Sequence, residues 1–189
     1  AERVGASGVT FLTQPLPPEL DSALKEFAAK YPGQVEYDAK RGMVKFSTDI
    51  VFDLGSDEVK PQALASLSDL AKIITSPAAG QFDVLIAGHT DNTPIVKTAT
   101  KEKFPTNWHL SAARAISVLW VLKNGSVAEN RMGVAGYGEY WPLVPNDSPK
   151  NKALNRRVEL FLVPKRTVGV AAPAEAKPAP AKTPAKIEK

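Results

Sequence analysis

Two charged residues stand where their type and position are unusual for a folded chain. Asp91 belongs to residues 87–94, AGHTDNTP, which follow the apolar run QFDVLI and so lie past the end of an expected buried strand. Arg114 belongs to NWHLSAARAISVLWVLKNG, where helical spacing puts it inside an apolar stripe, near the helix end that favours anions. A carboxylate accepts from an ammonium or amide N–H, and a guanidinium grips a carboxylate with two parallel hydrogen bonds. The implied ligand is an amino acid or short peptide end bearing both charges.

Structural roles and a metal site are the alternatives for the same residues. Arg114 could be a buried arginine paired with a carboxylate such as Asp91, and Asp91 could be a turn residue of TDNTP. His89 and Asp91 form an H-x-D pair, and with His109 they would make a set of zinc ligands. Against zinc, helical spacing puts His109 well away from Arg114, and an arginine beside the ion would repel it. For His89 we expect a hydrogen-bonded structural role.

Other chemistries find little support. Ser111 has no well-placed histidine base, and GVAGYG lies in an expected strand with no helix after it, so it is no phosphate loop. Residues 150–166 are basic, but they lack interleaved aromatics, and we expect most of them to be solvated. Arg156 and Arg157 are neighbours on an expected strand, so they point to opposite faces and cannot serve one surface. We therefore expect no nucleic-acid partner.

The elements that would position these residues follow from periodicity. Helices are expected near residues 18–31, 61–74 and 107–124, the last with Asn107 as N-cap and Asn124-Gly125 as a left-handed C-cap. Strands are expected at 82–88, 131–137 and 156–164, and in a hairpin around Lys40-Arg41-Gly42. The second helix should bury one stripe of residues, Leu64, Leu67, Ala71 and Ile74. In the second strand of the hairpin, apolar and polar residues should alternate up to residue 52, with the buried positions at Val44, Phe46, Thr48, Ile50 and Phe52.

This order predicts an α+β fold, a two-layer sandwich with a mixed β-sheet and helices packed on one face around a β-α-β-α-β-β core. We divide the 189 residues into an N-terminal helix and hairpin extension (1–43), the main domain (44–166) and a disordered Ala/Pro/Lys-rich tail (167–189). Cysteine is absent, which excludes disulfides and thiolate metal sites. No apolar run approaches the ~20 residues of a membrane-spanning helix, so we expect a soluble chain, with any anchoring segment lying upstream.

Four ordered motifs carry a family resemblance. GHTDNTP, NWHLSAARAISVLWVL, GVAGYGEYWPLVPND and NRRVELFLV together resemble the OmpA-like peptidoglycan-binding domain family, most closely its MotB-like branch, over about residues 44–163. The resemblance implies that Asp91 and Arg114 contact the peptidoglycan stem peptide, chiefly its diaminopimelate residue. It also implies that further residues line or shape the pocket, with the last of them at the rim: Thr90, Asn107, Leu110, Ser111 and Arg157.

The role implied by the resemblance is a non-enzymatic wall anchor in the periplasm or cell envelope, with no cofactor and no metal. Its expected partner is peptidoglycan; a membrane would be reached only through an upstream anchor, and pairing of two copies as a homodimer would raise retention. Two charge-assisted contacts suggest single-site affinity of roughly micromolar to millimolar. The alternatives are a metal-dependent peptidoglycan hydrolase and a periplasmic interaction domain of a flagellar-stator-like complex.

Overall fold

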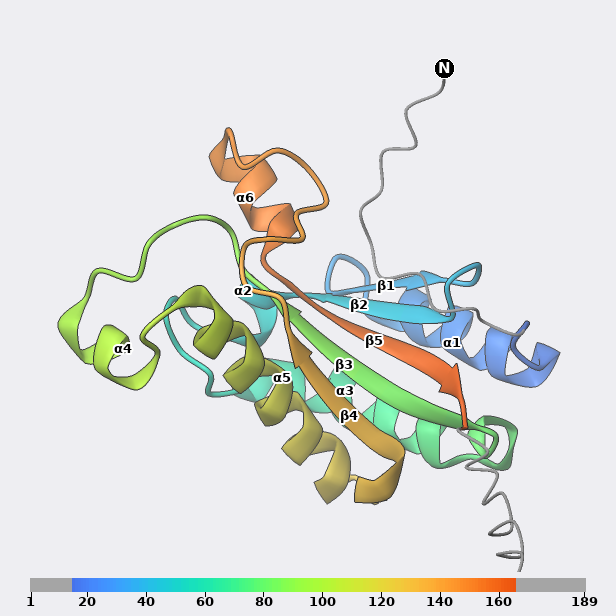
Figure 1. Ribbon diagram of the computed structural model, residues 1–189. Coiled ribbons are helices and arrows are strands. Elements are labelled where there is room, and N and C mark those ends of the chain that lie inside the picture. Colours follow the sequence, from blue (N-terminus) through green and yellow to red (C-terminus); the bar gives the residue numbers. More distant parts are fainter. Residues whose placement is uncertain (1–14, 166–189) are drawn as a thin grey trace, which may run out of the picture.

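The computed structural model describes residues 15–165, in which a five-stranded sheet carries the long helices on one face (Figure 1). The strand order is β1-β2-β5-β3-β4, and all neighbours are antiparallel except the parallel pair β3 and β4. The last strand within residues 15–165, β5, therefore lies between β2 and β3 at the centre of the sheet. The strands are β1 (Val35–Asp38), β2 (Met43–Ser47), β3 (Phe82–His89), β4 (Met132–Gly136) and β5 (Arg157–Pro164).

Three helices make the second layer. They are α1 (Pro18–Lys30), α3 (Pro61–Thr75) and α5 (Asn107–Asn124), and the connections add α2 (Thr48–Val51), α4 (Thr98–Lys103), α6 (Pro149–Asn155) and 3-10 turns at Pro77–Ala79 and Glu129–Arg131. The order β2, α3, β3, α5, β4, β5 is the expected β-α-β-α-β-β core. The two-layer α+β sandwich with a mixed sheet is therefore confirmed.

Alternation along the strands separates two apolar clusters. Alternate residues of β3 and β5, such as Ile86 and Leu160, join the large core beneath the helices. The residues between them face the other side of the sheet, where Ala87 and Phe161 form a smaller cluster with Met43. A side chain's position along β3 or β5 thus decides which face it serves.

Two glycines let α5 approach the sheet closely. A Cβ atom on Gly88 would lie 2.0 Å from the carbonyl oxygen of Ser111, and one on Gly136 would lie 2.7 Å from the backbone nitrogen of Ala112. Larger residues at these two strand positions would push the helix away. The close packing holds the first turns of α5 beside the end of β3, where the HTD sequence lies.

The second hairpin strand is shorter than its alternating pattern predicted. β2 ends at Ser47, and Thr48–Val51 forms the single helical turn α2. Val51 is fully buried whereas Ile50 is only half-buried, so the period of two breaks after Thr48. The expectation of a strand to residue 52 was wrong because a helical turn also buries Thr48 and Val51, three residues apart.

Details of two helices also differ from expectation. Leu64 is 41% exposed. The buried face of α3 includes Ala63 and Leu70 in addition to the expected Leu67, Ala71 and Ile74. Asn107 is the first helical residue of α5, preceded by Thr106 as N-cap. The left-handed cap lies one residue later than expected, because Ser126 has a φ of 73° whereas Gly125 has a φ of −82°. A Cβ there would meet that of Ala71 at 2.5 Å, which accounts for the glycine by close packing.

The N-terminal extension shares the sheet and the core of the main domain. β1 pairs with β2, and Leu20, Leu24 and Phe27 of α1 belong to the same cluster as Leu67 of α3. The division at residue 43 stays a prediction. The tail expected at 167–189 lies outside the described residues.

Candidate functional site

A cleft of about 520 Å³ opens at the end of β3, between α2, the β3–α4 connection and the first half of α5. Five of the residues singled out from the sequence line it: Thr90, Asp91, Asn107, Leu110 and Arg114. Four further charged residues line it that the sequence reasoning had not assigned to a site: Asp49, Lys60, Lys97 and Arg156. The cleft therefore combines carboxylates and cations from segments far apart in the chain.

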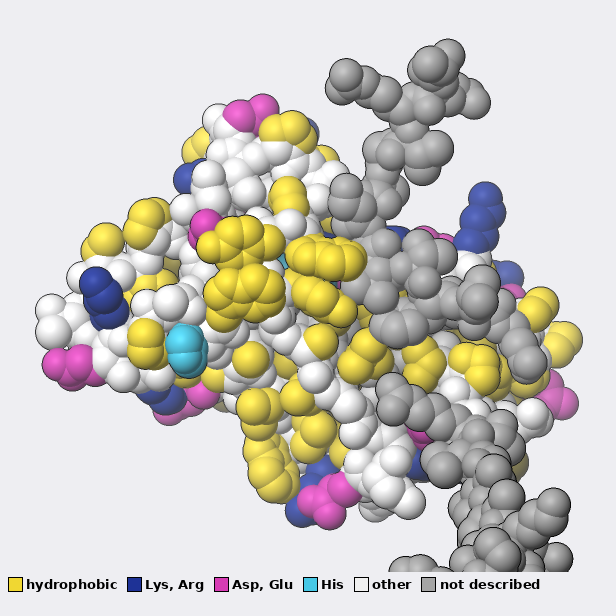
Figure 2. All heavy atoms as spheres, viewed as in Figure 1, with side chains coloured by type: hydrophobic (Ala, Val, Ile, Leu, Met, Phe, Trp, Pro, Cys, Tyr) yellow, Lys and Arg dark blue, Asp and Glu magenta, His cyan; other side chains and the backbone are white. Residues whose placement is uncertain are grey.

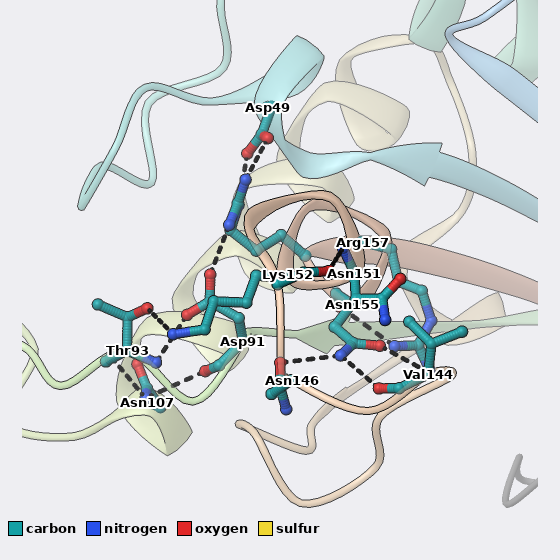
Figure 3. A network of polar contacts seen from close by, with 12 residues as sticks. Asp49, Asp91, Thr93, Asn107, Val144, Asn146, Asn151, Lys152, Asn155 and Arg157 are labelled. Atoms are coloured by element: carbon teal, nitrogen blue, oxygen red, sulfur yellow. Dashed lines mark hydrogen bonds and ion pairs between the residues drawn. The ribbon is translucent and has the colours of Figure 1, made fainter.

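Asp91 is held from two sides (Figure 3). Its Oδ1 accepts a hydrogen bond of 2.7 Å from the backbone N–H of Thr93, and its Oδ2 lies 2.5 Å from Nη1 of Arg156. Burial alone would raise the pKa of Asp91, but these hydrogen bonds outweigh it and hold the pKa below its usual value. Asp91 is therefore ionised and fixed in direction at neutral pH.

Arg156 is the functional-site candidate that sequence reasoning missed. It precedes β5 directly and bonds both oxygens of Asp49, with Nε–Oδ1 at 2.7 Å and Nη2–Oδ2 at 2.6 Å, while Nη1 bonds Asp91. The hydrogen bonds that Arg156 donates to Asp49 are the main cause that raises the pKa of Arg156 above its usual value. Asp49 and Arg156 are 107 residues apart, so the sequence carries no local signal for this bridge.

Arg114 lies buried at the side of the cleft, with 3% of its surface exposed. Its Nε donates to the carbonyl of Ser56 at 2.8 Å, its Nη2 donates to the carbonyl of Asp53 at 3.2 Å, and its guanidinium sits 5.3 Å from the ring centre of Phe52. Within residues 15–165, no carboxylate lies within ion-pair distance of it. Burial is the main cause that lowers the pKa of Arg114 to about 10. Asp91 and Arg114 thus share the cleft, but the paired arginine of Asp91 is Arg156.

Neighbouring polar residues hold the cleft walls together. The Nδ2 of Asn107 donates to the carbonyls of Asp91 at 3.4 Å and Thr93 at 3.2 Å, and to Glu139 Oε2 at 2.7 Å. The buried backbone N–H of Thr90 donates to the carbonyl of Gly138. Lys152 of α6 reaches Thr93 Oγ1 at 3.4 Å (Figure 3). The loop after β3 is therefore tied to α5, to α6 and to the segment after β4.

Ser111 and Arg157 do not line the cleft. Ser111 Oγ accepts from the backbone N–H of Gly138 and donates to the carbonyl of Trp108, so it shapes the backbone next to the cleft. Arg157 is the first residue of β5 and faces the other side of the sheet, where its Nε bonds Glu159 at 2.7 Å. The expectation of Arg157 at the rim is corrected, because strand alternation gives that place to its neighbour Arg156.

The three residues of the conceivable zinc set are not brought together. His89 is buried on the face opposite the helices, with Nε2 3.2 Å from Glu159 Oε2 and its ring stacked on Tyr137 at 5.2 Å. Burial is the main cause that lowers the pKa of His89. His109 is exposed and contacts Thr106 through Nδ1. Among residues 15–165 there is no group of three or more His, Cys, Asp or Glu side chains that could hold a metal ion.

Comparison with known proteins places the chain in a family. The OmpA family model matches residues 51–156. "Motility protein B" of Helicobacter pylori (strain ATCC 700392 / 26695) is 32% identical over 136 residues, which are 71% of this chain and 51% of that protein. The chain spans about half the length of the curated motility proteins it matches.

Solved structures show the same fold. The periplasmic domain of Helicobacter pylori MotB is 31% identical with a TM-score of 0.62, covering 74% of this chain and 85% of that one. The cell wall anchor of the T6SS from Pseudomonas aeruginosa is 26% identical with a TM-score of 0.67, covering 80% and 100%. No helix within residues 15–165 is long and apolar enough to cross a membrane. The matches locate the domain in the periplasm of the bacterial cell envelope, and the chain belongs to the OmpA family as a domain of the MotB type.

Proposed function

We propose that the cleft binds the stem peptide of peptidoglycan without covalent chemistry, chiefly through its diaminopimelate residue, and so anchors a cell-envelope protein to the wall. Attachment to the cell wall accords with the family, one of whose solved relatives is described as a cell wall anchor. The observation that carries the choice of ligand is Arg114, a buried cation in the cleft wall with backbone carbonyls as its hydrogen-bond acceptors.

A ligand carboxylate would complete the environment of Arg114. Burial without a carboxylate partner among residues 15–165 makes its charged form costly, which is why its pKa falls to about 10. Nε and Nη2 are used by Ser56 and Asp53, and Nη1 makes no hydrogen bond within the described part of the chain. An incoming carboxylate can accept from Nη1 at the cleft surface and restore the stability of the cation.

Asp91 suits the positive end of the same ligand. It is ionised, and its two oxygens are already oriented by Thr93 and Arg156, so binding costs little reordering of this side chain. The cleft also has an apolar wall that includes Leu54 and Val96, which are 84% and 80% exposed. Diaminopimelate is a zwitterion on an aliphatic chain. Its carboxylate would contact the cation Arg114, its ammonium group the carboxylate of Asp91, and its aliphatic chain the apolar side of the cleft.

Binding without catalysis fits these side chains. Ser111 is committed to the backbone of Trp108 and Gly138, and His89 lies on the opposite face, so neither supplies a nucleophile or base to the cleft. The wall repeats its stem peptide densely, so weak single sites would hold firmly when two copies or a membrane anchor link them.

The test is calorimetric titration with the tripeptide L-Ala–γ-D-Glu–meso-diaminopimelate, followed by co-sedimentation with wall sacculi. Arg114→Met should weaken tripeptide binding about 10- to 100-fold, the value of one or two charge-assisted hydrogen bonds. Replacing diaminopimelate by lysine, which lacks the extra carboxylate, should weaken binding to the wild-type protein in the same way.

Arg131→Met is the matched control. Arg131 also donates to backbone carbonyls, those of Ile74, Ala79 and Phe82, but at the start of β3, away from the cleft. The Arg131→Met variant should be less stable than the wild-type protein but should bind the tripeptide with unchanged affinity. Circular dichroism checks the fold of both variants. Equal affinity of wild-type protein and folded Arg114→Met for the tripeptide would overturn the proposal.

A further inference from the structure

Two exposed aromatic rings are stacked at the surface near the cleft. Trp108 and Tyr140 have ring centres 5.1 Å apart and an interplanar angle of 22°, and they remain 45% and 62% exposed. Figure 2 shows hydrophobic side chains gathered near the middle of the view, over the N-terminal end of α5 and the segment that follows β4. A solvent-facing pair of large aromatic rings leaves apolar area open that a binding partner would cover.

Hydrogen bonds join this aromatic pair to the rim of the cleft. Asn107, which lines the cleft, precedes Trp108, and Glu139 precedes Tyr140. The Nδ2 of Asn107 bonds both Glu139 Oε2 at 2.7 Å and the carbonyl of Thr93 at 3.2 Å. Trp108 and Tyr140 therefore follow directly on two residues, Asn107 and Glu139, that are hydrogen-bonded to each other. Asn107 also holds the loop that contains Asp91.

The backbone around the pair is held in place. Gly138 has a φ of 55°, a left-handed conformation, and a Cβ atom there would lie 3.3 Å from the backbone nitrogen of Trp108. Its N–H bonds Ser111 Oγ, which fixes the turn onto α5. Tyr137 and Trp141 pack against each other at 4.7 Å on either side of the same turn. The two exposed rings thus stand on a supported turn and the start of a helix.

We propose that the Trp108–Tyr140 pair binds a pyranose ring of the peptidoglycan glycan strand, as a second subsite beside the peptide cleft. A pyranose has an apolar face of C–H groups, which the electron-rich face of an aromatic ring attracts, and a polar rim of hydroxyl and N-acetyl groups. The carboxylate of Glu139 is next in sequence to Tyr140 and can accept from a hydroxyl or an amide N–H of that rim.

Continuity with the peptide cleft identifies the sugar as the occupant, and the inference to that extent rests on the proposed function. The stem peptide is joined to the lactyl group of an N-acetylmuramic acid, and two residues separate that group from diaminopimelate. Such a spacer reaches on the order of 10 Å. A peptide seated between Asp91 and Arg114 can therefore place its sugar at the rim of the cleft near Asn107, whose bond to Glu139 joins the rim to the aromatic pair.

The test compares two ligands that differ only in the sugar: the free tripeptide, and the same tripeptide on the disaccharide N-acetylglucosamine–N-acetylmuramic acid. Calorimetry on wild-type protein should give about 3- to 10-fold tighter binding of the disaccharide peptide, the value of one aromatic contact. Trp108→Ala and Tyr140→Ala should each remove most of this advantage and leave the affinity for the free tripeptide unchanged.

Trp120→Ala is the matched control. Trp120 is a 50% exposed tryptophan on the same helix, with Lys123 over its ring at 4.6 Å. It should keep the full sugar advantage, and circular dichroism should confirm the fold of all three variants.

The outcomes separate failure of the sugar subsite from failure of the peptide cleft. Tripeptide binding without any gain from the disaccharide overturns the subsite and leaves the peptide proposal standing. Binding of neither ligand overturns both. The aromatic pair could instead be occupied by a second copy of the chain, and analytical ultracentrifugation tests this. If the wild-type protein is a dimer and the Tyr140→Ala variant is a monomer, the aromatic pair is a contact between copies, and the sugar subsite is overturned.

Discussion

Arg156 and Arg157 are consecutive in the chain, and the structure sends them to opposite faces of the sheet. Arg156 enters the cleft, where it bonds both oxygens of Asp49 and one oxygen of Asp91. Arg157 is 1% exposed and bonds Glu159, which is 3% exposed. Figure 3 shows Asp91 to the left in the view and Arg157, Asn155 and Val144 to the right. Both networks join guanidinium to carboxylate, but only that of Arg156 borders the cleft of about 520 Å³; Glu159 lines a smaller pocket of about 190 Å³ on the other face.

The difference lies in what each network does for the protein. In a dry interior an unpaired charge is very costly, so the Arg157–Glu159 pair governs whether the chain stays folded. The side chains of Arg156 and Asp49 are 21% and 47% exposed, so their pairing contributes little to stability, and the network of Arg156 serves mainly to hold the buried Asp91 in one direction. One residue step along the chain thus separates a network in the interior from a network at the cleft for which we propose a role in binding.

The largest expected effect comes from breaking the buried network. Arg157→Ala leaves the carboxylate of Glu159 without its cation in the interior, and should lower the free energy of unfolding by about 3 to 5 kcal/mol. Urea unfolding followed by circular dichroism measures it. The double variant Arg157→Met/Glu159→Leu should recover much of the loss, since it leaves no charge unpaired. A loss below about 1 kcal/mol in Arg157→Ala would contradict the role given to this pair.

Acid should act on the same network. Burial raises the pKa of Glu159, but His89 and Arg157 outweigh it and lower the pKa to about 2, from its usual value of 4.5. As the pH falls from 4.5 to 2, the unfolded chain takes up this proton before the folded one, so stability is lost across that range. The loss should be on the order of 3 kcal/mol. Unfolding curves at stepped pH measure it, and Glu159→Gln should flatten this part of the profile; an unchanged slope would assign the acid sensitivity to other carboxylates.

A smaller effect, and one on binding, is expected from the other arginine. Arg156→Ala frees Asp91 to rotate and should weaken binding of the stem tripeptide about 5- to 10-fold, with a stability change below about 1 kcal/mol. Titration calorimetry and urea unfolding on the same preparation give both numbers. If Arg156→Ala destabilises the protein as much as Arg157→Ala, the proposed division between the two faces is wrong.

The smallest effect should come from Asp49, whose side chain is 47% exposed and holds the far side of Arg156. Asp49→Asn should weaken tripeptide binding no more than about threefold, because Asp91 keeps its own bonds to Arg156 and Thr93. A double-mutant cycle with Arg156→Ala should show that the two substitutions are not additive. Full additivity would mean that Asp49 acts on the ligand directly.

Local patterns in the sequence were sufficient for most of the elements and for the centre of the cleft. Asp91 follows a buried strand and Arg114 lies in the first half of a helix within an apolar stripe, and both positions follow from periodicity alone. The helical turn α2 was not predicted, because the alternation of residues around Thr48 and Val51 in the sequence also fits a strand. The short helices α4 and α6 were not predicted, because they lie in long polar connections and have no apolar stripe.

What the sequence determined by itself is the order of strands and helices, the family, and the presence of Asp91 and Arg114 near the end of β3, because these depend on spacing within short segments. Only the tertiary structure decided which arginine meets Asp91, since the path from α6 into β5 sets the face of residues 156 and 157. It also decided the acceptors of Arg114, which are backbone carbonyls of residues 53 and 56. Every residue has a carbonyl, so nothing in the letters of a sequence marks the ones that a distant guanidinium will meet.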